Sequence, residues 1–186
     1  MAPGATLTTT TGVRVIHKAL DADISFIYAA DVYSNAKSEE TDGKAFKGRR
    51  DDVVLATKFF MPMDSQPNDS GGSRKWIMQE AESSLRPLET DYIDLYQVHR
   101  PSAGTDVDET LSALTDVVRQ SKVRYIGASS YAASQMVEAP IVARNGNLSR
   151  FVTARVHQLM KIIVLLPSQL DTVPPHTHAM KGFRAP

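Results

Sequence analysis

Apolar, strand-like runs alternate along this chain with segments whose hydrophobic residues recur at helical spacing, and this alternation most limits its possible folds. The strand-like runs are ISFIYAA (24–30), VVLATKFF (53–60), YIDLYQVH (92–99) and VRYIGAS (123–129). A helical pattern precedes or follows each of them, and a further helical segment begins near Ala132 and ends at Gly146. Alternating helices and buried strands predict an α/β fold with a parallel sheet, either doubly wound or wrapped as a (β/α) barrel.

The order is weaker beyond Phe151. The runs FVTARV (151–156) and KIIVLLP (161–167) are each compatible with a strand, but no helix clearly separates them, and residues 172–186 resemble a loose tail. The chain has 186 residues, 42% of them hydrophobic, which suffices for one buried core and is short for two. We therefore predict a single domain over residues 1–186.

Charge and composition exclude several classes of function. Lysine plus arginine and aspartate plus glutamate each number 21, so no broad basic field is expected for nucleic acid or an anionic membrane. The chain has no cysteine, which excludes thiol catalysis and thiolate metal sites. Its longest aliphatic run, 162–166, is far below the roughly 20 residues of a membrane helix, so we expect a cytoplasmic protein. The histidines of the tail share no carboxylate at ligand spacing, and no metal site is expected.

Polar residues stand where the predicted strands end, which in parallel α/β folds is where function collects. They are Tyr33, Lys58, His99, Ser129 and Ser130. Taken singly, each has an ordinary structural explanation: a lysine can extend its ammonium to solvent, a histidine can be structural, and a tyrosine can be a packing aromatic. Taken together, the first three suit carbonyl reduction, with a phenol as proton donor, a cation lowering its pKa and an imidazole orienting the substrate oxygen.

Several motifs in consistent order resemble those of the aldo-keto reductases, which are NADPH-dependent (β/α) barrel enzymes. The motifs are ADVYSNAKSEE, DDVVLATKF, TDYIDLYQVHRP, ETLSALTDVVRQSKVRYIGASS and FVT. The resemblance covers residues 13–153 and leaves 154–186 as a diverged C-terminal segment. It implies that Tyr33 is the catalytic acid, Lys58 the lysine that lowers its pKa and His99 the group that orients the substrate. It also implies that Ser129 and Ser130 hold the nicotinamide carboxamide of NADPH.

Two residues depart from the family pattern near the implied site. Family members typically have an aspartate that pairs with the lysine, and Tyr28 stands in its place in FIYAADVY. A neutral phenol offers Lys58 a hydrogen-bond acceptor but no opposing charge, and Asp31 is an alternative partner. The glutamine that the resemblance implies for the carboxamide aligns near Arg155 in this chain.

Other departures concern the scaffold. A complete barrel of this kind takes about 250 residues, so we predict a partial (β/α)8 barrel of about four to six parallel strands. Proline 87 is expected in the last turn of its helix and Pro140 in mid-helix. Asp42 occupies a position that is usually apolar in the family, and Glu89 one that is usually glycine. The aspartate Asp94 is expected to be a solvated charge beside its strand.

The leading hypothesis is an aldo-keto reductase-like oxidoreductase that reduces a small aldehyde or ketone with NADPH, weakly or with impaired activity. The alternatives are a non-catalytic assembly protein on the same scaffold, comparable to the aldo-keto-reductase-like β subunits of potassium channels, and an inactive gene fragment. The open strand edges of a partial barrel also suggest a homo-oligomer that covers them.

Overall fold

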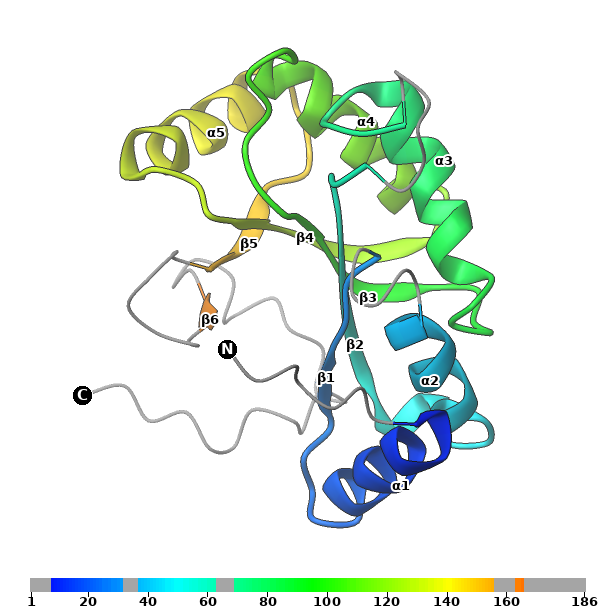
Figure 1. Ribbon diagram of the computed structural model, residues 1–186. Coiled ribbons are helices and arrows are strands. Elements are labelled where there is room, and N and C mark those ends of the chain that lie inside the picture. Colours follow the sequence, from blue (N-terminus) through cyan, green and yellow to red (C-terminus); the bar gives the residue numbers. More distant parts are fainter. Residues whose placement is uncertain (1–7, 32–36, 63–68, 156–162, 166–186) are drawn as a thin grey trace, which may run out of the picture.

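The computed structural model describes residues 8–31, 37–62, 69–155 and 163–165. Helices and strands alternate, as the sequence predicts (Figure 1). The helices are α1 (Thr9–Leu20), α2 (Lys37–Phe46), the 3-10 turn η1 (Arg50–Asp52), α3 (Arg74–Leu85), α4 (Val107–Arg119) and α5 (Ala133–Asn145). The strands are β1 (Phe26–Tyr28), β2 (Val54–Phe59), β3 (Ile93–Val98), β4 (Val123–Ser129), β5 (Phe151–Arg155) and β6 (Ile163–Leu165).

The strands form one curved sheet in the order β1-β2-β3-β4-β5-β6. Neighbours from β1 to β5 pair in parallel, and the helices cover the convex side of the sheet (Figure 1). Five parallel strands that alternate with helices make half of a (β/α) barrel, which confirms the predicted partial barrel. The sixth strand corrects one detail, because β6 pairs with β5 antiparallel. Only residues 156–162 separate them, too few for the crossover that parallel strands require.

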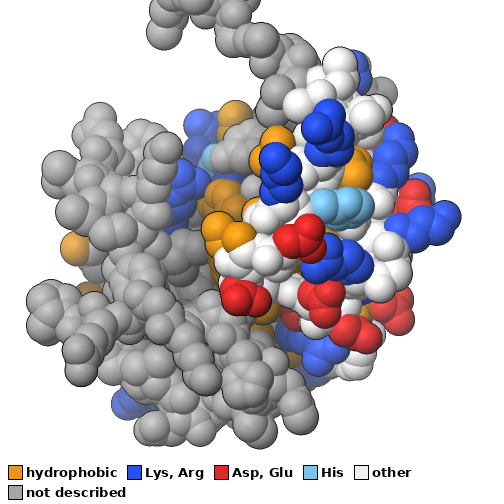
Figure 2. All heavy atoms as spheres, turned by 90° about the horizontal axis from the view of Figure 1, so that it is seen from below, with side chains coloured by type: hydrophobic (Ala, Val, Ile, Leu, Met, Phe, Trp, Pro, Cys, Tyr) orange, Lys and Arg blue, Asp and Glu red, His pale blue; other side chains and the backbone are white. Residues whose placement is uncertain are grey.

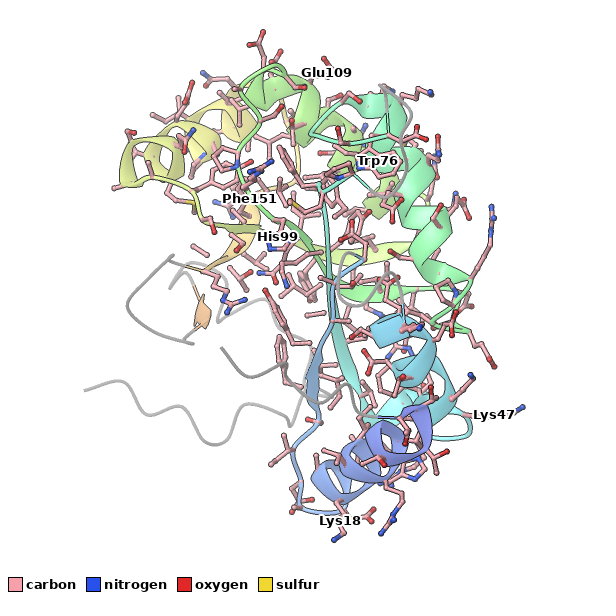
Figure 3. All side chains as sticks on the ribbon, viewed as in Figure 1. Lys18, Lys47, Trp76, His99, Glu109 and Phe151 are labelled. Atoms are coloured by element: carbon pink, nitrogen blue, oxygen red, sulfur yellow. The ribbon has the colours of Figure 1, made fainter. Side chains whose placement is uncertain are left out.

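The hydrophobic core lies between the helices and the convex face of the sheet. Trp76 of α3 is almost fully buried in it (labelled in Figure 3), and the rings of Phe59 and Tyr96 stack with their centroids 4.6 Å apart. Leu111 and Leu114 of α4 are fully buried against this layer. The other face of the sheet, at the carboxyl ends of its parallel strands, is where polar side chains can meet.

Pro87 and Pro140 occupy different positions relative to their helices. Helix α3 ends at Leu85, so Pro87 lies beyond it and the prediction that it falls in the last turn is wrong. Helix α5 does continue through Pro140 to Asn145, as predicted. Glu89, just after Pro87, has φ of 49°, a left-handed conformation that favours glycine and that a glutamate adopts at a cost.

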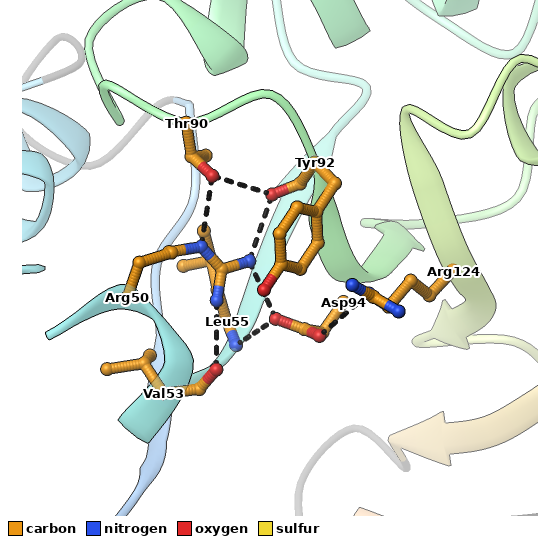
Figure 4. A network of polar contacts seen from close by, with 7 residues as sticks. All are labelled: Arg50, Val53, Leu55, Thr90, Tyr92, Asp94 and Arg124. Carbon is orange, nitrogen blue, oxygen red and sulfur yellow. Dashed lines mark hydrogen bonds and ion pairs between the residues drawn. The ribbon is translucent and has the colours of Figure 1, made fainter. Parts of the chain in front are cut away.

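Asp94 belongs to a partly buried polar network at the amino ends of the strands (Figure 4). Its carboxylate lies 2.8 Å from the guanidinium of Arg50 and accepts a 3.0 Å hydrogen bond from the backbone N–H of Leu55. Arg50 also donates to the carbonyl oxygens of Val53 and Tyr92. The expectation of a solvated charge at Asp94 is therefore wrong, because this residue ties β2 to β3 away from the predicted site.

The face of the molecule that includes α1 carries basic and acidic side chains in mixture. In its described part, Figure 2 shows Lys and Arg side chains interspersed with Asp and Glu. One such pair joins Arg49 to Asp21 at 2.8 Å. Among the described residues, moreover, none of the helices has the length and apolar character needed to cross a bilayer.

Helix α2 packs so closely on the segment after α3 that residue 43 has no room for a side chain. A Cβ on Gly43 would collide with the carbonyl oxygen of Pro87 and lie 2.8 Å from the carbonyl carbon of Leu88. Because both are backbone atoms, Gly43→Ala should lower the free energy of unfolding by about 3 kcal/mol, measured by urea titration. Gly104→Ala is the matched control, since a Cβ there meets nothing within 4 Å. Equal stability of the two variants would contradict this packing.

Candidate active site

Lys58 lies near the carboxyl end of β2 with its whole side chain buried. Its ammonium donates a 3.2 Å hydrogen bond to the carbonyl oxygen of Ala29 and lies 3.8 Å from the centre of the Tyr28 ring. The interpretation of Lys58 as a lysine that reaches solvent is therefore excluded. Burial favours loss of the proton from this ammonium, whereas the carbonyl and the aromatic face favour its charged form.

The surroundings of Lys58 bring its pKa close to neutrality. Burial is the main cause, and the nearby positive charge of Arg155 acts in the same direction. The carboxylate of Asp31 opposes them, and the net result lowers the pKa of Lys58 to about 7. The hypothesis that Asp31 acts as a partner for Lys58 thus has an electrostatic basis in the structure, since Asp31 is buried and favours the ammonium form.

Tyr28, the last residue of β1, meets cations from two other strands. Besides the Lys58 ammonium, the guanidinium of Arg155 donates a hydrogen bond of 3.2 Å to the phenolic oxygen of Tyr28. Arg155 ends β5, and β1 and β5 are not neighbours in the sheet. This contact therefore spans the concave side of the half-barrel.

His99 follows β3 directly, and its backbone N–H donates a 2.9 Å hydrogen bond to the carbonyl oxygen of Phe59. Figure 3 shows it on the concave side of the sheet, opposite the helices. Burial lowers the pKa of His99 to about 4, and the positive charges of Lys58, Arg155 and Arg100 contribute. The imidazole is therefore neutral near pH 7, a form in which one ring nitrogen donates and the other accepts a hydrogen bond.

Ser129 and Ser130 lie at the end of β4. The hydroxyl oxygens of the two residues are 3.5 Å apart, and Ser129 is buried. Ser130 has φ of 59°, and its backbone N–H donates to the carbonyl oxygen of Arg155 at 2.8 Å. Two adjacent hydroxyls, each able to donate and accept, are suited to a primary amide such as the carboxamide of a nicotinamide ring.

The structure thus brings four of the five predicted residues to one edge of the sheet. Lys58, His99 and Ser129 come from the carboxyl ends of three consecutive parallel strands, and Ser130 follows the last of them. Tyr33, the predicted catalytic acid, lies outside the described residues. Within the described part of the chain, no group of three or more histidine, aspartate and glutamate side chains is placed to hold a metal ion.

A buried polar contact below this edge was not foreseen. Gln97 of β3 donates a 3.2 Å hydrogen bond to the hydroxyl of Thr153 on β5, passing over β4 at Gly127. A Cβ on Gly127 would collide with that hydroxyl. Lys58 pairs in register with Gln97, so a row of buried polar side chains runs from Lys58 of the candidate site through Gln97 to Thr153. The signal in the sequence was a polar residue inside an otherwise apolar run, as at Lys58.

A family model described as "Aldo/keto reductase family" matches residues 3–163. The chain is 40% identical over 128 residues to "Aldo-keto reductase YhdN" of Bacillus subtilis. The matched residues are 68% of this chain and 39% of that protein. It is also 40% identical over 131 residues to "Probable voltage-gated potassium channel subunit beta" of Oryza sativa, covering 69% of this chain and 40% of that protein.

A third relative, "Aldo-keto reductase AMT2" of Alternaria alternata, is 33% identical over 171 residues, covering 78% of this chain and 47% of that protein. In all three alignments less than half of the relative's length is matched.

Proposed function

The chain belongs to the aldo/keto reductase family, and from this premise we propose that it reduces an aldehyde or ketone to an alcohol with NADPH, at a low rate. The observation that carries the proposal is a buried lysine with a pKa of about 7 at the end of β2. A neutral histidine, His99, follows the neighbouring strand β3, and the charge of that lysine contributes to lowering its pKa. A cation and a neutral imidazole at one sheet edge are suited to polarising a carbonyl oxygen.

The proposed roles follow the residues at this edge. His99 orients the carbonyl oxygen through a ring N–H, and Tyr33 donates the proton as the family resemblance implies. The ammonium form of Lys58 stabilises the phenolate that remains. Because burial lowers the pKa of Lys58 to about 7, part of the chains lack that ammonium at neutral pH. This partial charge is our reason for proposing a low rate.

The hydroxyl pair of Ser129 and Ser130 fits the carboxamide of a nicotinamide cofactor, as its donor and acceptor capacity indicates. These two residues would hold that group beside Arg155, whose carbonyl oxygen fixes the backbone of Ser130. When bound, NADPH would supply a hydride for the carbonyl carbon, while the residues described above position the oxygen and move the proton.

The first test is a thermal melt followed by circular dichroism, with and without NADPH, together with turnover of an aromatic aldehyde. We expect NADPH at 100 times its dissociation constant to stabilise the folded chain by about 2.7 kcal/mol, because it binds the native state. Ser129→Ala combined with Ser130→Ala should reduce this shift, and NADH in place of NADPH should give a smaller one. A cooperative melt that ignores NADPH, in a chain without turnover, would refute the proposal.

A second candidate function is assembly without catalysis. It is supported by the similarity to the rice protein named as a potassium channel β subunit. It is also supported by two exposed apolar side chains one turn apart on α5, Val137 and Ile141. A defined oligomer in sedimentation analysis, combined with the absence of any NADPH-dependent shift, would favour this candidate over the reductase.

A further inference from the structure

Tyr28 is held between two cations that come from different strands. The guanidinium of Arg155 donates to its phenolic oxygen at 3.2 Å, and the ammonium of Lys58 lies 3.8 Å from its ring centre. Tyr28 is itself half-buried at the end of β1, on the same sheet edge as Lys58 and His99. A phenol is thus fixed within the candidate active site by groups that carry positive charge.

Both contacts favour the phenolate over the phenol. A hydrogen bond from a guanidinium strengthens when its acceptor becomes an anion, and a cation near an ionisable phenol lowers its pKa. Arg155 is the more important of the two, because a guanidinium keeps its charge at every pH at which a tyrosine ionises. Lys58, with a pKa of about 7, loses most of its charge in that range.

The remaining charged groups around this phenol act in both directions. Asp31, just after β1, is a carboxylate close enough to Lys58 to raise its pKa, and it opposes a phenolate. Arg100, beyond His99, adds positive charge on the side of β3. His99 adds none near pH 7, because its pKa is about 4. A directly bonded guanidinium outweighs one carboxylate and the partial burial of the ring.

We propose that Tyr28 is a second acid–base group of this site and an alternative donor to Tyr33. In turnovers in which Tyr33 does not protonate the bound carbonyl, the phenol of Tyr28 delivers the proton to its oxygen while Arg155 holds the resulting phenolate. This inference rests on the proposed reduction. The carbonyl carbon gains the hydride that a bound NADPH supplies, the O–H bond of Tyr28 breaks, and its proton completes the alcohol. The cofactor is oxidised, the carbonyl is reduced, and the phenolate regains a proton from water.

The contact between Tyr28 and Arg155 supports this role. Tyr28 stands where the resemblance implies an aspartate, and Arg155 near the place where it implies a glutamine. In the structure this phenol and this guanidinium form one hydrogen-bonded pair across the half-barrel. A phenol alone would weaken the hold on Lys58, whereas a phenol paired with a guanidinium supplies a proton and a charge that stabilises its loss.

The decisive experiment follows tyrosinate absorbance near 295 nm during a pH titration. The chain has six tyrosines, and we expect one to ionise at least one pH unit below the ordinary value of about 10. This early signal should vanish in Tyr28→Phe, move to higher pH in Arg155→Gln and persist in Tyr125→Phe, the half-buried control on β4. Circular dichroism at each pH confirms that the variants stay folded. If Tyr28→Phe differs from the native chain in tyrosinate absorbance only at or above pH 10, Tyr28 ionises no earlier than an ordinary tyrosine and the proposal is overturned.

Turnover then separates this inference from the proposed function. If the native chain reduces an aromatic aldehyde, Tyr28→Phe should lower kcat about tenfold and change its pH profile, since a positioned acid contributes at least that much. Unchanged kcat in a folded Tyr28→Phe chain would overturn the proton-donor role and leave the reductase standing. A native chain without turnover refutes the proposed function and the proton-donor role together, while the titration still decides whether Arg155 stabilises the phenolate.

Discussion

The Asp42→Asn variant is expected to be more stable than the native chain by about 3 kcal/mol at pH 7.5 and hardly more stable at pH 4. Asp42 lies on α2 and is only 6% exposed. Burial, and then the nearby charge of Glu39, raises its pKa to about 7. The folded chain therefore keeps a proton on Asp42 that the unfolded chain has released, and an amide, which is neutral in both states, avoids this penalty.

The sign of the pH dependence follows from proton counting. Between the ordinary pKa of 3.8 and about 7, the folded state binds more protons at Asp42 than the unfolded state does. Asp42 therefore costs the folded chain no stability at low pH, and the free energy of unfolding falls as the pH rises through that interval. The gap between Asp42→Asn and the native chain should widen from pH 4 to pH 7 and then stay level.

Urea titrations at pH 4, 5.5 and 7.5 would measure this gap. Comparing two chains at each pH is essential, because other buried groups add slopes of their own. Glu80, with its pKa raised to about 8 chiefly by burial, acts in the same direction, and His99 acts in the opposite one. Asp51→Asn, at an exposed position, is the matched control and should show no gap that changes with pH. A gap of constant size for Asp42→Asn would contradict the burial of an ionisable carboxyl.

The alternation in the sequence was sufficient to predict the first four parallel strands and the helices between them, because each strand is one apolar run and each helix one periodic stripe. The fifth strand was only compatible with its run, FVTARV. The direction of β6 was not predictable in the same way. Its antiparallel direction depends on the short connection after β5, and not on any pattern of apolar residues within the strand. Asp94 was misjudged because an isolated aspartate gives no indication that Arg50 lies opposite it.

The candidate site was predicted in part. Lys58, His99 and Ser129 follow from one rule, that polar residues at the carboxyl ends of parallel strands share an edge. The pairing of Tyr28 with Arg155 does not follow from it, because β1 and β5 meet only through the curvature of the sheet. Curvature is a property of the packed sheet and leaves no trace in the spacing of residues along a strand.

Lys58→Met should raise stability and abolish function together. We expect a gain of about 3 kcal/mol in the free energy of unfolding at pH 6, and a loss of more than 100-fold in the turnover of an aromatic aldehyde. The gain arises because methionine fills the same buried volume without an ammonium to desolvate. The loss arises because no cation remains at the end of β2 to stabilise a phenolate.

The sign of this effect with pH is opposite to that at Asp42. The pKa of Lys58 is lowered from 10.5 to about 7, so between these values the unfolded chain holds a proton that the folded chain has released. The native chain therefore carries the full cost of the buried cation at and below pH 7 and recovers stability as the pH rises towards 10.5. The advantage of Lys58→Met should shrink between pH 6 and pH 9.5 in urea titrations.

Lys47→Met is the matched control, because Lys47 is exposed at the surface (Figure 3), and it should change neither stability nor turnover appreciably. A Lys58→Met chain that is less stable than the native one at pH 6 would show that the Tyr28 and Ala29 contacts more than offset the burial of the charge. A chain that gains stability and keeps its turnover would place Lys58 outside the reaction. Only a gain in stability combined with a loss of turnover identifies a lysine that is retained for chemistry at the expense of the fold.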